Sequence, residues 1–191
     1  FFFSSRRRHT RLLTVTGVRR VLFRSRNIRR RVDPFVAAKN NQNGMAEFEA
    51  HNLAEDGDVL VISGVSGVSN MGGISSLTGQ RQGERGAVVM GGVRDVRHSR
   101  SIDYPVWASE ITPVTGKWRI ETVEINGEIQ MGNVRVNPGD LVIADDTGVV
   151  FVPRDRIIDV IELCEKKKKG EDSRIGSINE GVPVPVFYNK G

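Results

Sequence analysis

Two short apolar runs, joined by a glycine-rich loop and a segment with helical spacing, constrain the fold more than any other part of the sequence. Residues 59–62 and 87–90 are uninterrupted apolar runs of strand length and are typical of buried strands. The first follows the turn Asp56-Gly57-Asp58 and ends before Ser63, and the second lies between Gly86 and Gly91. Between them, Ile74 and Leu77 lie at helical spacing. The order strand, loop, helix, strand predicts a right-handed βαβ crossover and therefore an α/β fold.

The second half of the chain is typical of a β layer followed by a helix. Turn signals such as Asn126-Gly127 and Asn137-Pro138-Gly139 separate its apolar runs. These runs predict strands at 120–125, 129–131, 134–136, 141–144 and 149–152, forming a meander or a small barrel-like layer. After Pro153, helical spacing predicts a helix with the lysines 166–169 in its later turns. The apolar tail 182–188 is expected to pack on the body or on a neighbouring subunit.

Three shorter elements complete the prediction. Residues 45–53 favour a short helix, and residues 96–102 a second short helix or a turn. A strand is expected at 104–108, with Pro105 near its start, where a missing N–H donor is tolerated.

The positive net charge does not lie on the predicted domain. The chain has 191 residues, enough for one domain with a real core, and a formal net charge of +5. Eleven arginines and no acidic residue fall within residues 1–31, so the remaining 17 basic and 23 acidic residues leave the body at −6. A duplex-binding domain normally spreads its basic residues over a folded face. We therefore expect no nucleic-acid partner.

The arginine-rich N-terminus is expected to lie outside the domain. Residues 1–26 have no sustained helical or strand period and do not have the layout of a secretory signal. Their composition allows a mitochondrial presequence, but FFFSSRRRHTR resembles translated sequencing-adapter text more closely. We therefore interpret residues 1–31 as non-native or disordered, and residues 32–191 as a single domain whose native N-terminus is truncated.

The remaining composition points to a cytoplasmic protein. The single cysteine, Cys164, excludes an internal disulfide and a thiolate metal cluster. No apolar run reaches the roughly 18 to 20 residues that a membrane helix needs, so no membrane partner is expected.

A candidate site follows from the two predicted strands. Gly72-Gly73 precedes the helix, which Ser69 or Asn70 would cap, and free N–H groups at a helix start can hold an anion. Arg94-Asp95 follows the turn predicted at residues 91–92. A guanidinium can clamp a carboxylate and a carboxylate can hold a divalent metal. Both groups follow strand ends, where α/β sheets bind ligands.

Other chemical groups are weaker candidates. His98 lies three residues after Asp95 and could face the site, while Asp145-Asp146 is more typical of a turn than of a metal site. The lysines 166–169 could be a phosphate patch, although a solvated helix end explains them better. No Ser-His-Asp arrangement, Walker loop or dinucleotide fingerprint can be assembled from the sequence.

Several segments together resemble the RraA-like family, which includes the regulator of ribonuclease E activity and class II pyruvate aldolases. The segments are GDVLVISG (57–64), GG-I (72–74), RGAVVMGGVRD (85–95), YPVWA (104–108) and NVRVNPGDLVIADDTGVVFVP (133–153). The likeness covers roughly residues 45–180. The family signature places an acidic residue or glycine twenty residues before Arg-Asp, as Gly73 and Arg94-Asp95 are placed here.

The resemblance implies a three-layer β/β/α swivelling domain that assembles as a homotrimer or hexamer. It implies a lyase that acts on a small 2-oxo acid through a pyruvate enolate, either as an oxaloacetate decarboxylase or as a 4-hydroxy-4-methyl-2-oxoglutarate aldolase. Asp95 would hold Mg²⁺ or Mn²⁺, Arg94 would contact the substrate oxygen, and the amides of Gly72, Gly73, Ile74 and Ser75 would bind the carboxylate. The alternative is a non-catalytic regulator that binds a protein such as a ribonuclease.

Two positions depart from the aldolase pattern of that family. Gly73 stands where aldolase members carry aspartate, and Met90 stands where they often do. The first of these aspartates helps to order water around the metal in the family. Metal and 2-oxo acid binding are therefore firmer expectations than retro-aldol cleavage, and decarboxylation needs less acid–base machinery.

Overall fold

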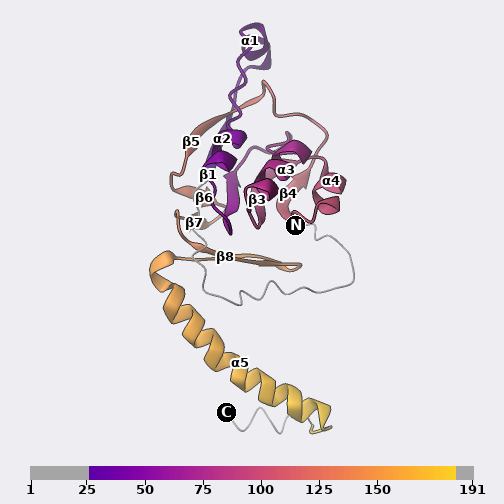
Figure 1. Ribbon diagram of the computed structural model, residues 1–191, viewed down its shortest axis with the longest axis vertical. Coiled ribbons are helices and arrows are strands. Elements are labelled where there is room, and N and C mark those ends of the chain that lie inside the picture. The colour runs from indigo at the N-terminus through magenta and orange to yellow at the C-terminus, as the bar shows by residue number, and fades with distance from the viewer. Residues whose placement is uncertain (1–25, 184–191) are drawn as a thin grey trace. The chain divides into compact units, whose positions relative to one another are not determined.

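A five-stranded sheet forms the centre of the computed structural model, which describes residues 26–183 (Figure 1). Its strand order is β4-β3-β2-β1-β5. The four strands from β1 to β4 are parallel, and β5 runs antiparallel to β1. The strands are β1 (Arg26–Arg31), β2 (Val59–Ser63), β3 (Gly86–Val93), β4 (Val106–Ile111) and β5 (Ile120–Ile125).

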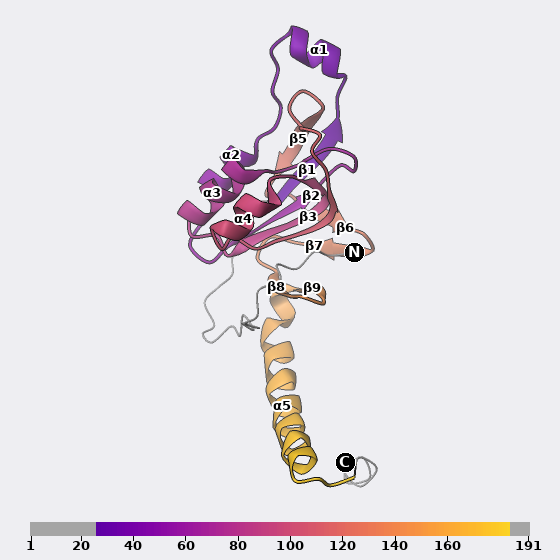
Figure 2. The same cartoon turned by 90° about the vertical axis from the view of Figure 1, so that its right-hand side faces the viewer.

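Helices cover one face of this sheet and β-hairpins the other (Figure 2). The helices are α2 (Glu47–Asn52), α3 (Gly73–Arg81) and α4 (Val96–Ser101), and the short α1 (Pro34–Lys39) follows β1. The hairpins pair β6 (Ile129–Met131) with β7 (Val134–Val136), and β8 (Leu141–Asp145) with β9 (Gly148–Val152). The chain therefore has the α/β, three-layer β/β/α architecture expected from the sequence.

The alternation of side chains along β2 explains why both of its faces are covered. Leu60 and Ile62 lie in the core beneath the helices, whereas Val59 and Val61 lie in a second core with Ile129. Successive strand residues point to opposite faces, so an uninterrupted apolar run fits a strand buried on both sides.

The predicted strands of the second half are found, but their pairing differs from the expected meander. The β5 strand joins the main sheet beside β1, with Ile120 opposite Arg31. Only β6–β7 and β8–β9 form separate hairpins among the described residues. The local turn signals fixed these hairpins, whereas the place of β5 depends on a strand distant in sequence.

The predicted N-terminal boundary at residue 31 needs correction, because residues 26–31 form β1. Their backbone pairs with β2 on one side and with β5 on the other. An arginine-rich strand with no apolar alternation carries no sequence signal for a sheet position. The rest of the segment, residues 1–25, lies outside the described residues, and so do residues 184–191 of the predicted apolar tail.

The chain divides into two units, Phe1–Arg154 and Asp155–Gly191, where the sequence suggested one domain. After the 3₁₀ turn η1 (Arg154–Arg156), the second unit consists of α5 (Ile157–Asn179), which has no buried residue. The lysines 166–169 are exposed in the middle of α5 rather than near its end. Between residues 26 and 183 no helix is both long and apolar enough to cross a membrane.

Candidate functional site

The end of β3 delivers Arg94-Asp95 to the start of α3. Gly91 and Gly92 do not form the predicted turn, because β3 continues through them to Val93 with a register shift against β4. A Cβ on Gly92 would lie 2.5 Å from the carbonyl oxygen of Val68. Glycine therefore lets the loop before α3 pack directly on the β3 backbone.

Asp95 is bound to the first turn of α3. Its Oδ2 accepts a hydrogen bond from the N–H of Gly73 at 2.9 Å, and Arg94 Nε lies 3.6 Å from the same oxygen. Asp95 also has left-handed backbone angles, with φ 56° and ψ 31°, as the N-cap residue of α4. Aspartate is one of the few non-glycine residues that adopt this conformation readily.

The close approach of Arg94, Asp95 and His98 to the start of α3 requires glycine at positions 72 and 73. A Cβ on Gly72 would lie 2.8 Å from Asp95 Oδ2 and 2.9 Å from Arg94 Nε. A Cβ on Gly73 would lie 3.0 Å from His98 Cδ2. The structure therefore brings Arg94, Asp95 and the glycine pair together, although 20 residues separate Gly73 from Arg94.

The predicted N-cap of α3 is wrong. Gly72 is the N-cap residue and provides no side-chain hydrogen bond. The fully buried Asn70 instead holds the preceding loop, since its Oδ1 accepts from Val65 N at 2.9 Å and its Nδ2 donates to Gly92 O at 3.1 Å. Asn70 therefore braces the loop against β3, a role that depends on distant contacts rather than on local sequence.

Asp95 already occupies one amide of the predicted anion site. The N–H of Gly73 donates to Asp95, and the N–H of Ser76 donates to Gly72 O. Within the described chain, the N–H groups of Ile74 and Ser75 have no hydrogen-bond acceptor, as expected in the first turn of a helix. The N–H of Gly72 likewise donates to no acceptor in the described part of the chain, so three of the four predicted amides remain for an anion.

An open depression of about 560 Å³ lies beside this turn. It is lined by Gly73, Ile74, Asp95, Arg97, His98 and Ser101. His98 thus faces the site that holds Asp95, as the spacing allowed. The depression has a carboxylate, a guanidinium and an imidazole on its walls, which suits a small polar ligand.

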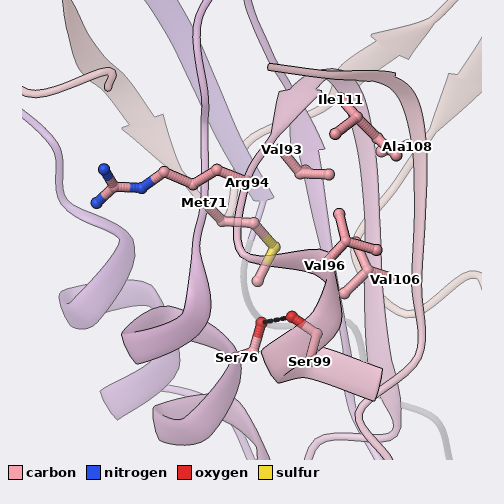
Figure 3. Close-up of a pocket in the computed structure, with 9 residues that line it drawn as sticks. All are labelled: Met71, Ser76, Val93, Arg94, Val96, Ser99, Val106, Ala108 and Ile111. Atoms are coloured by element: carbon pink, nitrogen blue, oxygen red, sulfur yellow. Dashed lines mark hydrogen bonds between the residues drawn. The ribbon is translucent and has the colours of Figure 1, made fainter. Parts of the chain in front are cut away.

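A second cavity beneath Arg94 is too small to hold a substrate (Figure 3). Its volume is about 20 Å³, room for roughly one water molecule. Figure 3 shows the Arg94 guanidinium pointing away from this cavity, whereas Ser76 and Ser99 share a 2.8 Å hydrogen bond at its edge. The guanidinium therefore lies outside the core beside Asp95, although Arg94 lines this small cavity and not the open depression.

Asp95 suits a hydrated magnesium ion better than a metal held wholly by protein. Between residues 26 and 183 no cluster of three or more His, Cys, Asp or Glu side chains could hold a metal. The Asp95 side chain is 49% exposed, and its Oδ1 accepts no hydrogen bond in the described part of the chain. Mg²⁺ is commonly bound by one or two carboxylates, with water and substrate oxygens completing its shell.

Asp145 has a turn role, as the sequence favoured. Its Oδ1 accepts hydrogen bonds from the N–H of Thr147 and Gly148 in the β8–β9 turn. The hydrogen bond from the Thr147 hydroxyl is the main cause that lowers the pKa of Asp145. Asp145 therefore stabilises the turn of the β8–β9 hairpin, and this hairpin carries no residue of the candidate site.

A buried polar network behind α3 could not be predicted from the sequence. His51 Nδ1 lies 2.7 Å from Glu84 Oε1, and His51 Nε2 lies 2.7 Å from Ser75 Oγ. Tyr104 donates its hydroxyl proton to Glu84 Oε2 at 2.6 Å. Burial, followed by the charge and hydrogen bond of Glu84, raises the pKa of Tyr104 well above its usual value. The four residues come from separate segments and match no motif spacing.

Comparison with known proteins identifies relatives that this chain covers to different extents. The chain is 38% identical over 90 residues to protein DlpA of Legionella pneumophila, a match that covers 47% of this chain and 15% of DlpA. It is 35% identical over 100 residues to an uncharacterized protein of Methanocaldococcus jannaschii, covering 52% of this chain and 48% of the relative. The chain thus spans half or less of the length of these two relatives.

A third relative is more evenly covered. The chain is 28% identical over 148 residues to a protein of Halalkalibacterium halodurans provisionally named 4-hydroxy-4-methyl-2-oxoglutarate aldolase, covering 76% of this chain and 70% of the relative.

Solved structures support the fold. A protein of Pseudomonas syringae has a TM-score of 0.76 at 20% identity, covering 87% of this chain and 74% of the other. Streptomyces coelicolor RraAS2, described as an unusual member of the RNase ES inhibitor RraA protein family, has a TM-score of 0.66 at 25% identity, covering 79% and 75%.

The family model described as RraA-like, Aldolase/RraA, matches residues 18–151. This match begins within the segment predicted to be non-native and includes β1. It also contains the glycine pair and Arg94-Asp95. The chain belongs to the RraA-like family.

Proposed function

We propose that this protein is a divalent-metal-dependent lyase that breaks a C–C bond in a small 2-oxo acid and releases pyruvate. Oxaloacetate is the preferred substrate class in this proposal. Retro-aldol cleavage of 4-hydroxy-4-methyl-2-oxoglutarate is secondary, because Gly73 stands where aldolase members of the family carry aspartate.

One observation carries this proposal. The Asp95 carboxylate, the Arg94 guanidinium and the glycine-rich start of α3 meet at one point, with Asp95 Oδ2 2.9 Å from Gly73 N and 3.6 Å from Arg94 Nε. A protein that only binds partners has no evident need for a half-exposed carboxylate beside an arginine and free helix amides.

Asp95 would hold Mg²⁺ or Mn²⁺, which when bound supplies positive charge to stabilise the enolate oxygen that forms as the C–C bond breaks. Arg94 supports the same charge from its own side, since a guanidinium placed where negative charge develops lowers the barrier. In decarboxylation, the electron pair of the broken bond remains on the pyruvate fragment while CO₂ leaves. A proton from solvent then converts the enolate to pyruvate.

The start of α3 orients the substrate. The N–H groups of Ile74 and Ser75 lie at the positive end of the helix dipole, where a carboxylate is stabilised, and of these two residues Ile74 lines the depression. Arg97 and His98 line the same depression as Ile74 and would face the distal part of a 2-oxo acid bound there. The four residues come from two neighbouring helices, so the substrate would lie between α3 and α4.

Pyruvate release from oxaloacetate by the full chain tests the proposal. Turnover should require Mg²⁺ or Mn²⁺, stop with EDTA, and fall by at least about 100-fold in Asp95→Ala and Arg94→Ala. Arg100→Ala and Asp155→Ala are matched controls, because both side chains are exposed and lie outside the depression. Metal-independent turnover, or equal losses in the controls, would overturn the mechanism.

A non-catalytic regulator is the second candidate. The likeness to RraAS2, at 25% identity, favours it, because that protein is described as a member of a family of RNase ES inhibitors. The absence of turnover over a broad panel of 2-oxo acids, together with tight binding to a ribonuclease, would favour this candidate over the lyase.

A homotrimer or hexamer, located in the cytoplasm, belongs to the same proposal. Ile74 and Leu77 on α3 are 73% and 48% exposed beside the site, and a neighbouring subunit could cover them. Analytical ultracentrifugation of the full chain tests the assembly. A monomer at micromolar concentration would exclude it.

A further inference from the structure

Four buried polar side chains form a continuous chain of hydrogen bonds behind the candidate site. Tyr104 Oη donates to Glu84 Oε2 at 2.6 Å, Glu84 Oε1 lies 2.7 Å from His51 Nδ1, and His51 Nε2 lies 2.7 Å from Ser75 Oγ. The side chains of His51 and Glu84 have no exposed surface, and Ser75 and Tyr104 are 3% and 2% exposed. The chain therefore runs from the segment before β4 to the first turn of α3.

The order serine, histidine, carboxylate is that of a nucleophile with its base, but burial excludes that role here. The Ser75 hydroxyl is sealed from the open depression, which is lined by Gly73 and Ile74 but not by Ser75. A nucleophile must reach its substrate within hydrogen-bond distance. The network must therefore act on the position of α3 rather than on a ligand.

The first turn of α3 is tethered at three residues from two sides. Gly73 N donates to Asp95 Oδ2, Ser75 Oγ bonds to His51 on α2, and Ser76 Oγ bonds to Ser99 on α4. Figure 3 shows the last of these contacts. Tethers from opposite sides fix both the rotation and the position of the turn, which apolar packing alone specifies less sharply.

Glu84 holds His51 in one orientation. Both of its carboxylate oxygens are occupied, one by His51 and the other by the Tyr104 hydroxyl. Gly79 gives the carboxylate room, since a Cβ there would lie 2.4 Å from Glu84 Oε2. The imidazole is thus fixed by a partner that cannot itself rotate, and its second nitrogen is directed at Ser75.

We infer that His51 is a positioning residue which, through Ser75, fixes the first turn of α3 against Asp95. The expected effect of His51 on substrate binding rests on the proposed function, because the first turn of α3 supplies the amides proposed to bind the 2-oxo acid. The structural consequence, a defined contact between Gly73 N–H and Asp95, does not depend on it.

Two substitutions of His51 separate its two contacts. A glutamine amide reaches the place of Nε2, so His51→Gln keeps the bond to Ser75 and loses the bond to Glu84. An asparagine amide reaches the place of Nδ1, so His51→Asn keeps Glu84 and loses Ser75. Ser75→Ala removes the same contact from the other side. Thr78→Ala is the matched control, because the Thr78 hydroxyl donates only to Ile74 O in the same helix.

The readouts are amide hydrogen exchange of residues 73–77, the ¹H chemical shift of the Gly73 amide, and KM and kcat for oxaloacetate. In Ser75→Ala and His51→Asn we expect exchange about tenfold faster, a shifted Gly73 resonance, and a KM raised about tenfold with kcat changed less than about threefold. His51→Gln should lie closer to the unaltered protein, and Thr78→Ala should match it.

Unchanged exchange and an unchanged Gly73 resonance in Ser75→Ala and His51→Asn would overturn the inference, and so would equal effects in Thr78→Ala. Faster exchange with unaltered kinetics would show that the tether is structural only. If the unaltered protein turns over no 2-oxo acid, the proposed function fails, while the exchange and the Gly73 resonance still decide whether His51 fixes the turn.

Discussion

The Asp95 carboxylate accepts the N–H of Gly73 at 2.9 Å, although the two residues are 22 positions apart. One oxygen of Asp95 thereby caps α3, while the other has no hydrogen-bond partner within the described chain. The Asp95 side chain thus has two roles, because it holds the start of α3 in place and is also the proposed metal ligand. Its two roles can be separated by substitution.

Replacing Asp95 should distinguish capping from metal binding. Asp95→Asn keeps an oxygen acceptor for Gly73 and tolerates the left-handed backbone, so it should lose less than about 1 kcal/mol of unfolding free energy. Asp95→Ala should lose about 2 kcal/mol, from the lost cap and the strained backbone. Both should weaken Mn²⁺ binding at least about 100-fold, measured by electron paramagnetic resonance. Mn²⁺ affinity retained in either variant would contradict the metal role.

We expect that aspartate, the residue of the aldolase members, fits at position 73 only if the His98 side chain moves. A Cβ on Gly73 would lie 3.0 Å from His98 Cδ2 and 3.3 Å from Asp95 Cβ. We expect Gly73→Asp to lose about 1–2 kcal/mol in urea unfolding, and His98→Ala, at an exposed position, less than about 0.5 kcal/mol.

The double variant Gly73→Asp/His98→Ala should recover at least half of that loss, because the crowding is relieved. It should also gain retro-aldol activity relative to decarboxylation. Strictly additive effects in the unfolding experiment would show that His98 does not occupy the place of the missing side chain.

Gly79→Ala should destabilise the protein, although alanine normally favours a helix interior by about 1 kcal/mol over glycine. The new Cβ would lie 2.4 Å from Glu84 Oε2 and 2.7 Å from Tyr104 Oη, so the buried network would have to shift. We expect a net loss of about 2 kcal/mol in urea unfolding. Gly170→Ala in α5, where nothing lies within 4 Å, should instead raise helicity, seen by circular dichroism. A stabilised Gly79→Ala protein would refute the packing of this network.

Tyr104 should make stability fall at alkaline pH. The pKa of Tyr104 is raised in the folded protein, mainly by burial, so above about pH 10 the unfolded chain loses a proton that the folded protein keeps. Stability should then fall by an extra 1.4 kcal/mol or so per pH unit until the folded pKa is reached. Tyr104→Phe should lose about 1–3 kcal/mol at neutral pH, since Glu84 loses a donor, but should show a shallower alkaline decline.

Urea unfolding between pH 8 and pH 11 measures this difference. Tyrosinate absorbance provides a second measurement, because the chain has two tyrosines and Tyr104→Phe removes one of them. Equal alkaline slopes for the two proteins would contradict the buried environment of Tyr104.

The elements with local signals were predicted well. The apolar run at 59–62 became β2, the run at 87–90 became the centre of β3, and Asn126-Gly127 separates β5 from β6. These patterns depend on burial and on turn stereochemistry within a few residues, so the sequence carries them directly. The twenty-residue spacing from Gly73 to Arg94 likewise carried the site hypothesis.

The errors concern residues whose partners are distant in sequence. β1 was missed because its arginines give no apolar pattern, and its place between β2 and β5 rests on backbone pairing. Asn70 was expected to cap α3 but braces the loop on β3 instead. A cap is a local choice, and a tertiary contact at a buried position outweighed it.

By itself, the sequence determined the α/β class, the order of most elements, the acidic body and the pairing of a glycine-rich helix start with Arg94-Asp95. Tertiary structure alone decided that Asp95 caps α3, that His98 faces Gly73, and that Ser75, His51, Glu84 and Tyr104 form one buried chain. The reason is physical. Local patterns record which residues avoid water and which backbone angles are allowed, whereas the partner of a buried polar group is fixed only when distant segments pack together.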